Sequence, residues 1–201
     1  MRRSAFTLIE LIFAMVIIAI AFSVLPKVLY LATKTSITTL KEEAMYNAVA
    51  YAGLIRASAW DENNTEVDDI LLVENGTSAY DCNISTGYRE GGFSGSRNCL
   101  DEKTASALGS DGGDLDDIDD FGSVSASNSN DSRKYDINAS IAYVEDTFFS
   151  TTQLNNSTNS KRIVIIVHPK KKARELGSSL VKLNFTLYNI GQLRVNKRRW
   201  N

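Results

Sequence analysis

The sequence predicts an α+β fold in which a long N-terminal α-helix packs its second half against an antiparallel β-sheet. Three observations support this prediction. An almost unbroken apolar run near the N-terminus is followed by a two-faced helical stripe, and together they predict one helix. The last third of the chain alternates between apolar and polar residues, which predicts strands with one buried face. The region between is rich in Gly, Ser, Asn and Asp and predicts loops.

Composition argues against some classes of function. The 201 residues carry 22 basic and 24 acidic side chains, a net charge of −2, and removal of Arg2 and Arg3 would change this to −4. We therefore do not expect a strongly basic nucleic-acid binder. The single histidine, His168, stands beside a proline and lysines without a nucleophile motif or a phosphate-binding glycine loop. We expect neither an enzyme nor a resident cofactor.

Residues 6–25 form the apolar run, which has about the length of one bilayer-spanning helix. Arg2 and Arg3 precede it without an acidic residue between. The positive-inside rule therefore predicts a cytoplasmic N-terminus and a periplasmic location for everything after Pro26. The run is not followed by an Ala-x-Ala site, which argues against its removal as a secretory signal peptide. We expect a single-pass protein of the inner membrane.

Glu10 is the one charged side chain inside this run. A carboxylate within lipid costs about 3 kcal/mol on insertion scales, so such a residue usually has a partner and a purpose. A plain membrane anchor does not explain it. Glu10 is therefore a candidate functional residue.

The segment Ser-Ala-Phe-Thr-Leu-Ile-Glu-Leu, residues 4–11, resembles the processing site of type IV prepilins and type II secretion pseudopilins. The resemblance implies that the membrane-embedded prepilin peptidase cuts between Ala5 and Phe6 and that the new amine of Phe6 is methylated. It also implies that the chain assembles with other pilin subunits through pilus or type II secretion machinery. The family most often has Gly before the cut bond, where this chain has Ala5, and this departure bears on the efficiency of processing.

Cleavage before Phe6 would give Glu10 a partner. The new ammonium lies four residues ahead of Glu10 on one helical face, and it is also available to the Glu10 of a neighbouring subunit. A subunit out of register would leave the carboxylate unpaired in apolar surroundings, so we predict that Glu10 acts in assembly. The alternative is a single-pass inner-membrane protein whose periplasmic domain binds a partner and never enters a filament. It predicts an uncut N-terminus.

The helix is predicted to continue after Pro26 with two faces. Apolar residues recur at steps of three and four over residues 37–55, while charged residues fall elsewhere. Pro26 removes one backbone donor and is expected to kink or loosen the helix. The polar residues 61–64 favour turns. We expect the helix to end near Ser58.

Residues 61–134 are predicted to form a loop-rich region with one or two strands. Cys82 and Cys99 lie in it without the C-x-x-C spacing of metal and redox sites. In an oxidising compartment they would most simply form a disulfide. This bond would close a loop of about 18 residues and stabilise the fold by roughly 3 kcal/mol in the chain-entropy model.

Six aspartates crowd into residues 111–120 of the same region. Carboxylates on a glycine-containing loop suit calcium, although the residue order of an EF-hand loop and its terminal glutamate are missing. A solvated acidic turn is the commoner outcome for such a segment. Calcium therefore stays a hypothesis, and its candidate ligands are Asp111, Asp114, Asp116, Asp117, Asp119 and Asp120.

The C-terminal region is predicted to form three strands of an antiparallel sheet. Residues 135–144 alternate between apolar and polar side chains, and residues 180–189 also alternate. Residues 163–167 are apolar and largely β-branched, which indicates a central strand. The polar segments 150–160 and 168–177 then form the connecting loops.

The second half of the chain carries a looser resemblance. Residues 115–121, 135–144 and 161–167 are similar to minor pilins of the mannose-sensitive haemagglutinin type. This resemblance implies a minor rather than a major pilin. Basic clusters at 170–174 and 197–199 could attract DNA, but the acidic balance of the chain and the absence of an accompanying aromatic ladder argue against DNA as a partner.

The sequence thus predicts an inner-membrane precursor that later joins an extracellular filament or a periplasmic pseudopilus. Its predicted parts are a leader (1–5), a transmembrane or filament-core helix (6–25), an amphipathic continuation (26–60), a loop-rich variable region (61–134) and a C-terminal antiparallel sheet (135–201).

Overall fold

The computed structural model describes residues 7–65, 70–78, 80–89, 99, 102–109, 115–122, 135–147, 150–170 and 177–191. The chain divides into two compact units, Met1–Glu43 and Ala44–Asn201. The first unit is helical from Leu8 onward, and the second holds the end of the same helix and all the strands. Each unit is described by itself below.

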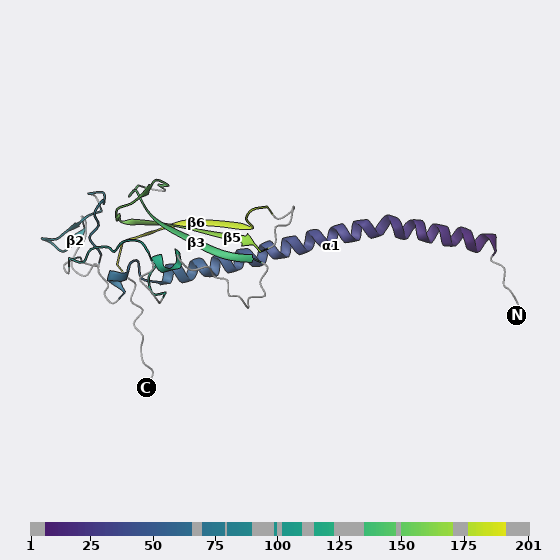
Figure 1. Cartoon of the computed structure of the whole chain (residues 1–201), viewed down its shortest axis with the longest axis horizontal. Coiled ribbons are helices and arrows are strands. Elements are labelled where there is room, and N and C mark those ends of the chain that lie inside the picture. The colour runs from purple at the N-terminus through teal and green to yellow at the C-terminus, as the bar shows by residue number, and fades with distance from the viewer. Residues whose placement is uncertain are drawn as a thin grey trace, which may run out of the picture. The chain divides into compact units, whose positions relative to one another are not determined.

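Helix α1 spans Leu8–Ala57 and continues through Pro26 without interruption (Figure 1). The predicted end near Ser58 is confirmed, whereas Phe6, the predicted start, lies outside the described residues. In the first unit, the large apolar side chains from Leu8 to Leu31 are exposed. A soluble protein would bury such a stripe, so these side chains need an apolar partner that the single chain does not supply.

The chain after α1 is held by a short 3₁₀ helix, η1, at Glu62–Asn64. The carboxylate of Asp61 accepts a hydrogen bond from the backbone N–H of Asn63, and the Asn64 side chain accepts one from the backbone N–H of Asp61. This reciprocal capping satisfies donors that the turn would otherwise leave free. Asp61 and Asn64 are both fully buried, so the predicted turn is part of the core.

The main sheet of the second unit has the strand order β4-β3-β5-β6, with every neighbouring pair antiparallel. Three of these strands confirm the predicted ones: β3 (Tyr135–Val144), β5 (Ser160–Pro169) and β6 (Val181–Tyr188). Strand β5 lies between β3 and β6, as its continuous apolar stretch predicted.

The prediction of three strands was wrong at one edge of this sheet. Strand β4 (Gln153–Leu154) lies inside the segment 150–160 that was predicted to be a loop, and it pairs with Tyr143 and Val144 of β3. Two residues are too short to show an alternating pattern. Strand β5 also extends into both predicted loops, because its whole length pairs with β3.

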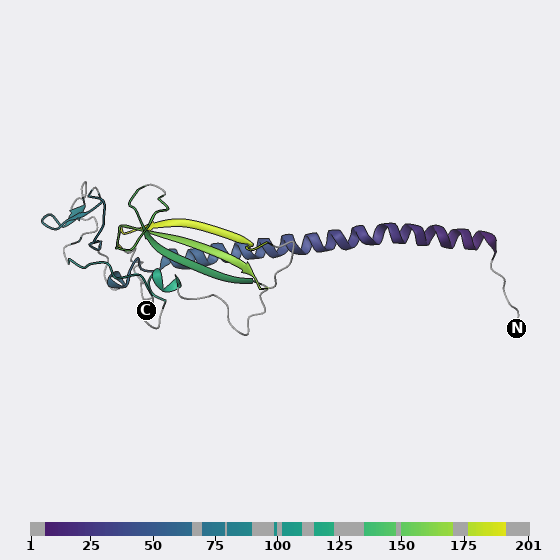
Figure 2. The same cartoon turned by 45° about the horizontal axis from the view of Figure 1, so that its top comes forward.

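The core of the second unit lies between this sheet and the last part of α1. Figures 1 and 2 both show β3, β5 and β6 running along that part of the helix. Two of the four helix residues that are buried here are alanines, which lets the sheet approach closely. The core residues on the three elements are Ala44, Ala48, Tyr51 and Ile55 of α1, Tyr135, Ile137, Ala139, Tyr143 and Val144 of β3, and Ile163, Ile165 and Val167 of β5.

Besides η1, the described parts of the loop-rich region contain three small elements. Strands β1 (Cys82–Asn83) and β2 (Tyr88–Arg89) form a short antiparallel hairpin, which confirms the prediction of one or two strands. A second 3₁₀ helix, η2 (Asp119–Gly122), lies against β3 and places the ring of Phe121 edge-on to Tyr51 of α1. This contact brings the acidic segment to the core.

Candidate functional site

Glu10 lies in the first turn of α1, surrounded along the helix by exposed apolar side chains. The helix starts where the backbone N–H of Leu11 donates to the carbonyl of Thr7. Ala5 and Phe6, the predicted cleavage site, lie outside the described residues. A carboxylate in the first turn also interacts favourably with the positive end of the helix dipole, so this position suits a negative charge in an apolar helix.

Among the described residues, α1 is the helix that is long and apolar enough to cross a membrane. Its most apolar stretch is wholly exposed, unlike the core helix of a soluble protein. The same exposed stretch can contact lipid or the equivalent helices of other subunits, because both partners are apolar. The first unit therefore has the properties of a membrane anchor that can also serve as a packing surface.

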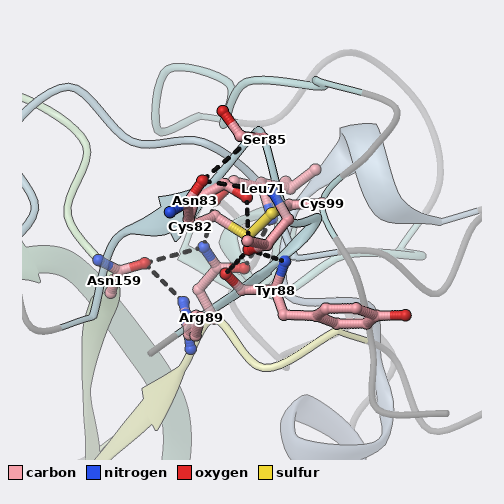
Figure 3. Close-up of a disulfide and its surroundings, with 10 residues drawn as sticks. Leu71, Cys82, Asn83, Ser85, Tyr88, Arg89, Cys99 and Asn159 are labelled. Atoms are coloured by element: carbon pink, nitrogen blue, oxygen red, sulfur yellow. Dashed lines mark hydrogen bonds between the residues drawn. A yellow bond between two sulfur atoms is a disulfide. The ribbon is translucent and has the colours of Figure 1, made fainter. Parts of the chain in front are cut away.

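The disulfide between Cys82 and Cys99 is confirmed. The two Cα atoms are 6.3 Å apart, within the usual range for a disulfide. Figure 3 shows the bond beside the β1–β2 hairpin, and the backbone N–H of Cys99 donates to the carbonyl of Gly87 in that hairpin. The bond therefore ties residue 99 to a hairpin that is too short to be stable alone.

A buried polar network joins this hairpin to the main sheet. Figure 3 shows Arg89 directed toward Asn159, whose side-chain oxygen accepts hydrogen bonds from Arg89 at 2.8 Å and from Asn189 at 3.0 Å. Asn159 in turn donates to Asp146 at 3.1 Å. Burial lowers the pKa of the Arg89 guanidinium, and the nearby charge of Asp146 opposes this effect. The network keeps several buried polar groups satisfied.

An open pocket of about 350 Å³ lies next to this network. Its walls include Tyr80, Tyr188 and Ile190, all partly exposed, together with Arg89 and Asp146. The two oxygens of Asp146 already accept hydrogen bonds from Thr77, Asn159 and Ser160. The carboxylate on the pocket wall therefore has a structural role.

Lys161 on β5 is the centre of a second polar cluster, and its side chain is fully buried. The ammonium donates to the backbone carbonyl of Trp60 at 2.8 Å, to Asp61 at 3.3 Å and to Asp119 at 2.5 Å. It also lies 4.5 Å from the centre of the Trp60 ring and 5.3 Å from that of Tyr143. Three acceptors and two aromatic faces replace the water that a lysine normally requires.

Sequence reasoning missed Lys161, although the signal was present. Lys161 is two residues before Ile163 and so shares the inward face of β5 with Ile163, Ile165 and Val167. A lysine on that face has to find a negative partner inside the protein. The alternation of β5 could therefore have predicted its burial, but not the identity of its partners.

The acidic segment 111–120 is only partly a solvated turn. Asp111 and Asp114 lie outside the described residues, and Asp116 is exposed. The expectation of a solvated turn is wrong for the other three candidate ligands, because the backbone pairing of residues 116–118 with Ala59 draws them into the core. These buried residues are Asp117, Asp119 and Asp120.

Burial raises the pKa of Asp117 to about 7, and the neighbouring charge of Asp119 adds to this rise. The hydrogen bond that Asp117 accepts from the backbone N–H of Asp120 acts in the opposite direction. Within the described part of the chain, no group of three or more His, Cys, Asp or Glu side chains has the arrangement of a metal site. Lys161 already supplies positive charge to Asp119, and calcium binding stays a prediction.

Comparison with family models gives a match at the N-terminal end of the chain. The model of the prokaryotic N-terminal methylation motif matches residues 1–26. Comparison with curated proteins and with solved structures finds no significant match. The matched segment contains the predicted cleavage site, Glu10 and the start of α1. The methylation motif and the α+β fold behind it therefore support a relation to the type IV pilin and pseudopilin family.

Proposed function

We propose that the chain is a structural subunit, a minor pilin or pseudopilin, of a type IV pilus-like filament. The observation that carries the proposal is Glu10, a carboxylate in the first turn of an exposed apolar helix, within a matched methylation motif. The motif supports cleavage by a prepilin peptidase, which we place between Ala5 and Phe6. Methylation of the new N-terminus then falls on Phe6.

In this proposal α1 is stored in the inner membrane and later buried among the helices of other subunits. The two environments are both apolar, so the transfer exchanges lipid contacts for helix contacts without exposing the stripe to water. The membrane and the filament differ in what they offer Glu10, because only the filament provides the ammonium of a neighbouring subunit as a partner for its carboxylate. Pairing therefore favours subunits in the correct register over subunits that are displaced along the filament.

The proposed topology has a cytoplasmic N-terminus and a periplasmic second unit. The disulfide between Cys82 and Cys99 supports this placement, since structural disulfides persist in oxidising compartments such as the periplasm. Cleavage removes the leader that carries Arg2 and Arg3. The mature subunit then enters an extracellular filament or a periplasmic pseudopilus.

A Glu10→Gln variant, produced in cells with their own assembly machinery, tests the proposed role of Glu10. The variant keeps the size and polarity of the side chain but removes the charge. We expect normal processing and at least a tenfold loss of incorporation into sheared filaments, since removing one partner of a desolvated pair costs about 3–5 kcal/mol. Immunoblots of the membrane and filament fractions measure both quantities.

Glu42→Gln is the matched control, because it makes the same change at an exposed position on the same helix outside the apolar run. We expect it to be incorporated like the unaltered protein. If the Glu10→Gln variant entered filaments as efficiently as the unaltered protein, the charge of Glu10 would have no role in assembly. It would favour the alternative of a membrane-anchored periplasmic binding domain, in which Glu10 has no partner subunit.

A further inference from the structure

The buried cluster around Lys161 brings together the reacting groups of a covalent cross-link. The amine nitrogen of Lys161 lies 2.5 Å from one oxygen of Asp119 and 3.3 Å from one oxygen of Asp61. The side chains of Lys161 and Asp61 are fully buried, and that of Asp119 is 3 % exposed. Two carboxylates thus share one amine where water is excluded.

The two carboxylates are held differently. Asp61 accepts hydrogen bonds from the backbone N–H groups of Asn63 and Ser106, and the Tyr143 hydroxyl lies 3.4 Å away. These donors fix the position of the Asp61 carboxylate beside the amine of Lys161. A carboxylate fixed within hydrogen-bond distance of an amine is a suitable base for it.

Asp119 has the arrangement of an electrophile. One oxygen contacts the amine of Lys161, and the other accepts a hydrogen bond of 3.0 Å from the backbone N–H of Gly109. If the amine attacked the carboxyl carbon, negative charge would develop on that second oxygen, where the Gly109 donor is already in place. Gly109 has a φ of +143°, a conformation that favours glycine.

The surroundings favour loss of water. The rings of Trp60 and Tyr143 lie on the amine, and both residues are buried. An amide carries no charge, so in these surroundings it is favoured over an ammonium beside a carboxylate, relative to the same exchange in water. The rings also exclude the water that would hydrolyse a product amide.

We infer that Lys161 and Asp119 form an intramolecular isopeptide bond, with Asp61 as the base. The amine nitrogen bonds to the side-chain carboxyl carbon of Asp119, and the bond from this carbon to one of its oxygens breaks. The two protons that leave the ammonium pass through Asp61 to the departing oxygen, which leaves as water. One amide and one water replace the ammonium and the carboxylate, and no oxidant or other reactant is needed.

This bond would link η2 to β5 through two residues that are 42 positions apart in the chain. Because β5 is an interior strand of the main sheet, the link would fix the acidic segment to the part of the fold that opens last. The disulfide between Cys82 and Cys99 closes a different loop, which contains neither Asp119 nor Lys161. The two covalent links would act on different segments.

The test is the intact mass of the full chain, purified from cells in detergent and reduced, and compared with the mass calculated for its observed N-terminus. We expect a deficit of one water molecule. Tandem mass spectrometry of a protease digest should assign the deficit to a peptide pair joined through Lys161 and Asp119. An unaltered protein without the deficit would overturn the inference, as would a deficit located at another residue pair.

Three variants test whether the mass deficit comes from Lys161 and Asp119. The test does not depend on any single variant being stable. Lys161→Met removes the amine and should have its calculated mass, and a deficit that persists there contradicts the inference. Asp119→Asn would lose ammonia instead of water, so that its reacted product has the same mass as the reacted unaltered chain. Lys170→Met is the matched control, because the Lys170–Asp136 pair is 3.6 Å apart and about one third exposed. It should keep the deficit.

Discussion

Asn189 shows how single polar residues hold the second unit together. Its side-chain oxygen accepts a hydrogen bond from the backbone N–H of Leu71, and its side-chain nitrogen donates to the carbonyl of Leu71 and to Asn159. Asn189 is fully buried. It therefore satisfies two backbone groups of an apolar segment that has no strand partner at residue 71.

An Asn189→Ala variant should lower the free energy of unfolding by about 2–6 kcal/mol. The reason is that the backbone N–H and carbonyl of Leu71 stay buried without partners, and each such group costs about 1–3 kcal/mol. Asn138→Ala makes the same change at an exposed position of β3 and should alter stability by less than about 0.5 kcal/mol. Chemical unfolding followed by near-ultraviolet circular dichroism compares the two, and equal effects would refute this role of Asn189.

Asp117 gives the second unit a predictable dependence on pH. Its pKa rises from 3.8 to about 7 on folding, mainly because of burial. Between these two pH values the folded state therefore binds more protons than the unfolded state. The contribution of Asp117 to the free energy of unfolding consequently falls as the pH rises and is lost above about pH 7. Below about pH 4 the carboxyl is protonated in both states, and the contribution is fully present.

An Asp117→Asn variant should be more stable than the unaltered chain at about pH 8 and should lose that advantage near pH 5. The amide keeps an oxygen that can accept the hydrogen bond from the backbone N–H of Asp120, but it carries no charge at any of these pH values. Thermal unfolding at the two pH values measures the difference. A pH-independent effect of the substitution would contradict the raised pKa.

At the scale of elements, the sequence predicted what depends on periodicity and missed what depends on tertiary partners. Helix α1 and strands β3, β5 and β6 each have a regular apolar pattern, and all four were predicted. Strand β4 was missed because two residues show no period. The burial of Asp61 and Asp119, and the identity of the partners of Lys161, were missed because they depend on residues that are distant in sequence.

The two faces of β5 supply a prediction at this scale. Ile165 is fully buried between the sheet and the rest of the core, whereas its neighbour Ile166 faces the other way and is partly exposed. Ile165→Ala should cost about 2–5 kcal/mol in stability because it leaves a cavity. Ile166→Ala should cost clearly less, since its site can refill with water. Chemical unfolding measures the loss of stability in each variant. A larger loss for Ile166→Ala than for Ile165→Ala would mean that the register of β5 is wrong.

The whole molecule combines an exposed apolar helix with an α+β unit that has its own core. The first unit determines where the protein resides, because its side chains need lipid or other apolar helices. The second unit folds around the sheet and needs no membrane for its core. The methylation motif matches residues 1–26, at the N-terminal end of the first unit, and leaves the second unit outside the match.

The most direct test of this account is the N-terminal sequence and intact mass of the protein from cells that contain their own prepilin peptidase. The account predicts a chain that starts at Phe6 and carries one N-methyl group. A chain that starts at Met1 would contradict it, and the protein would then be a membrane-anchored periplasmic domain in which Ala5 prevents cleavage.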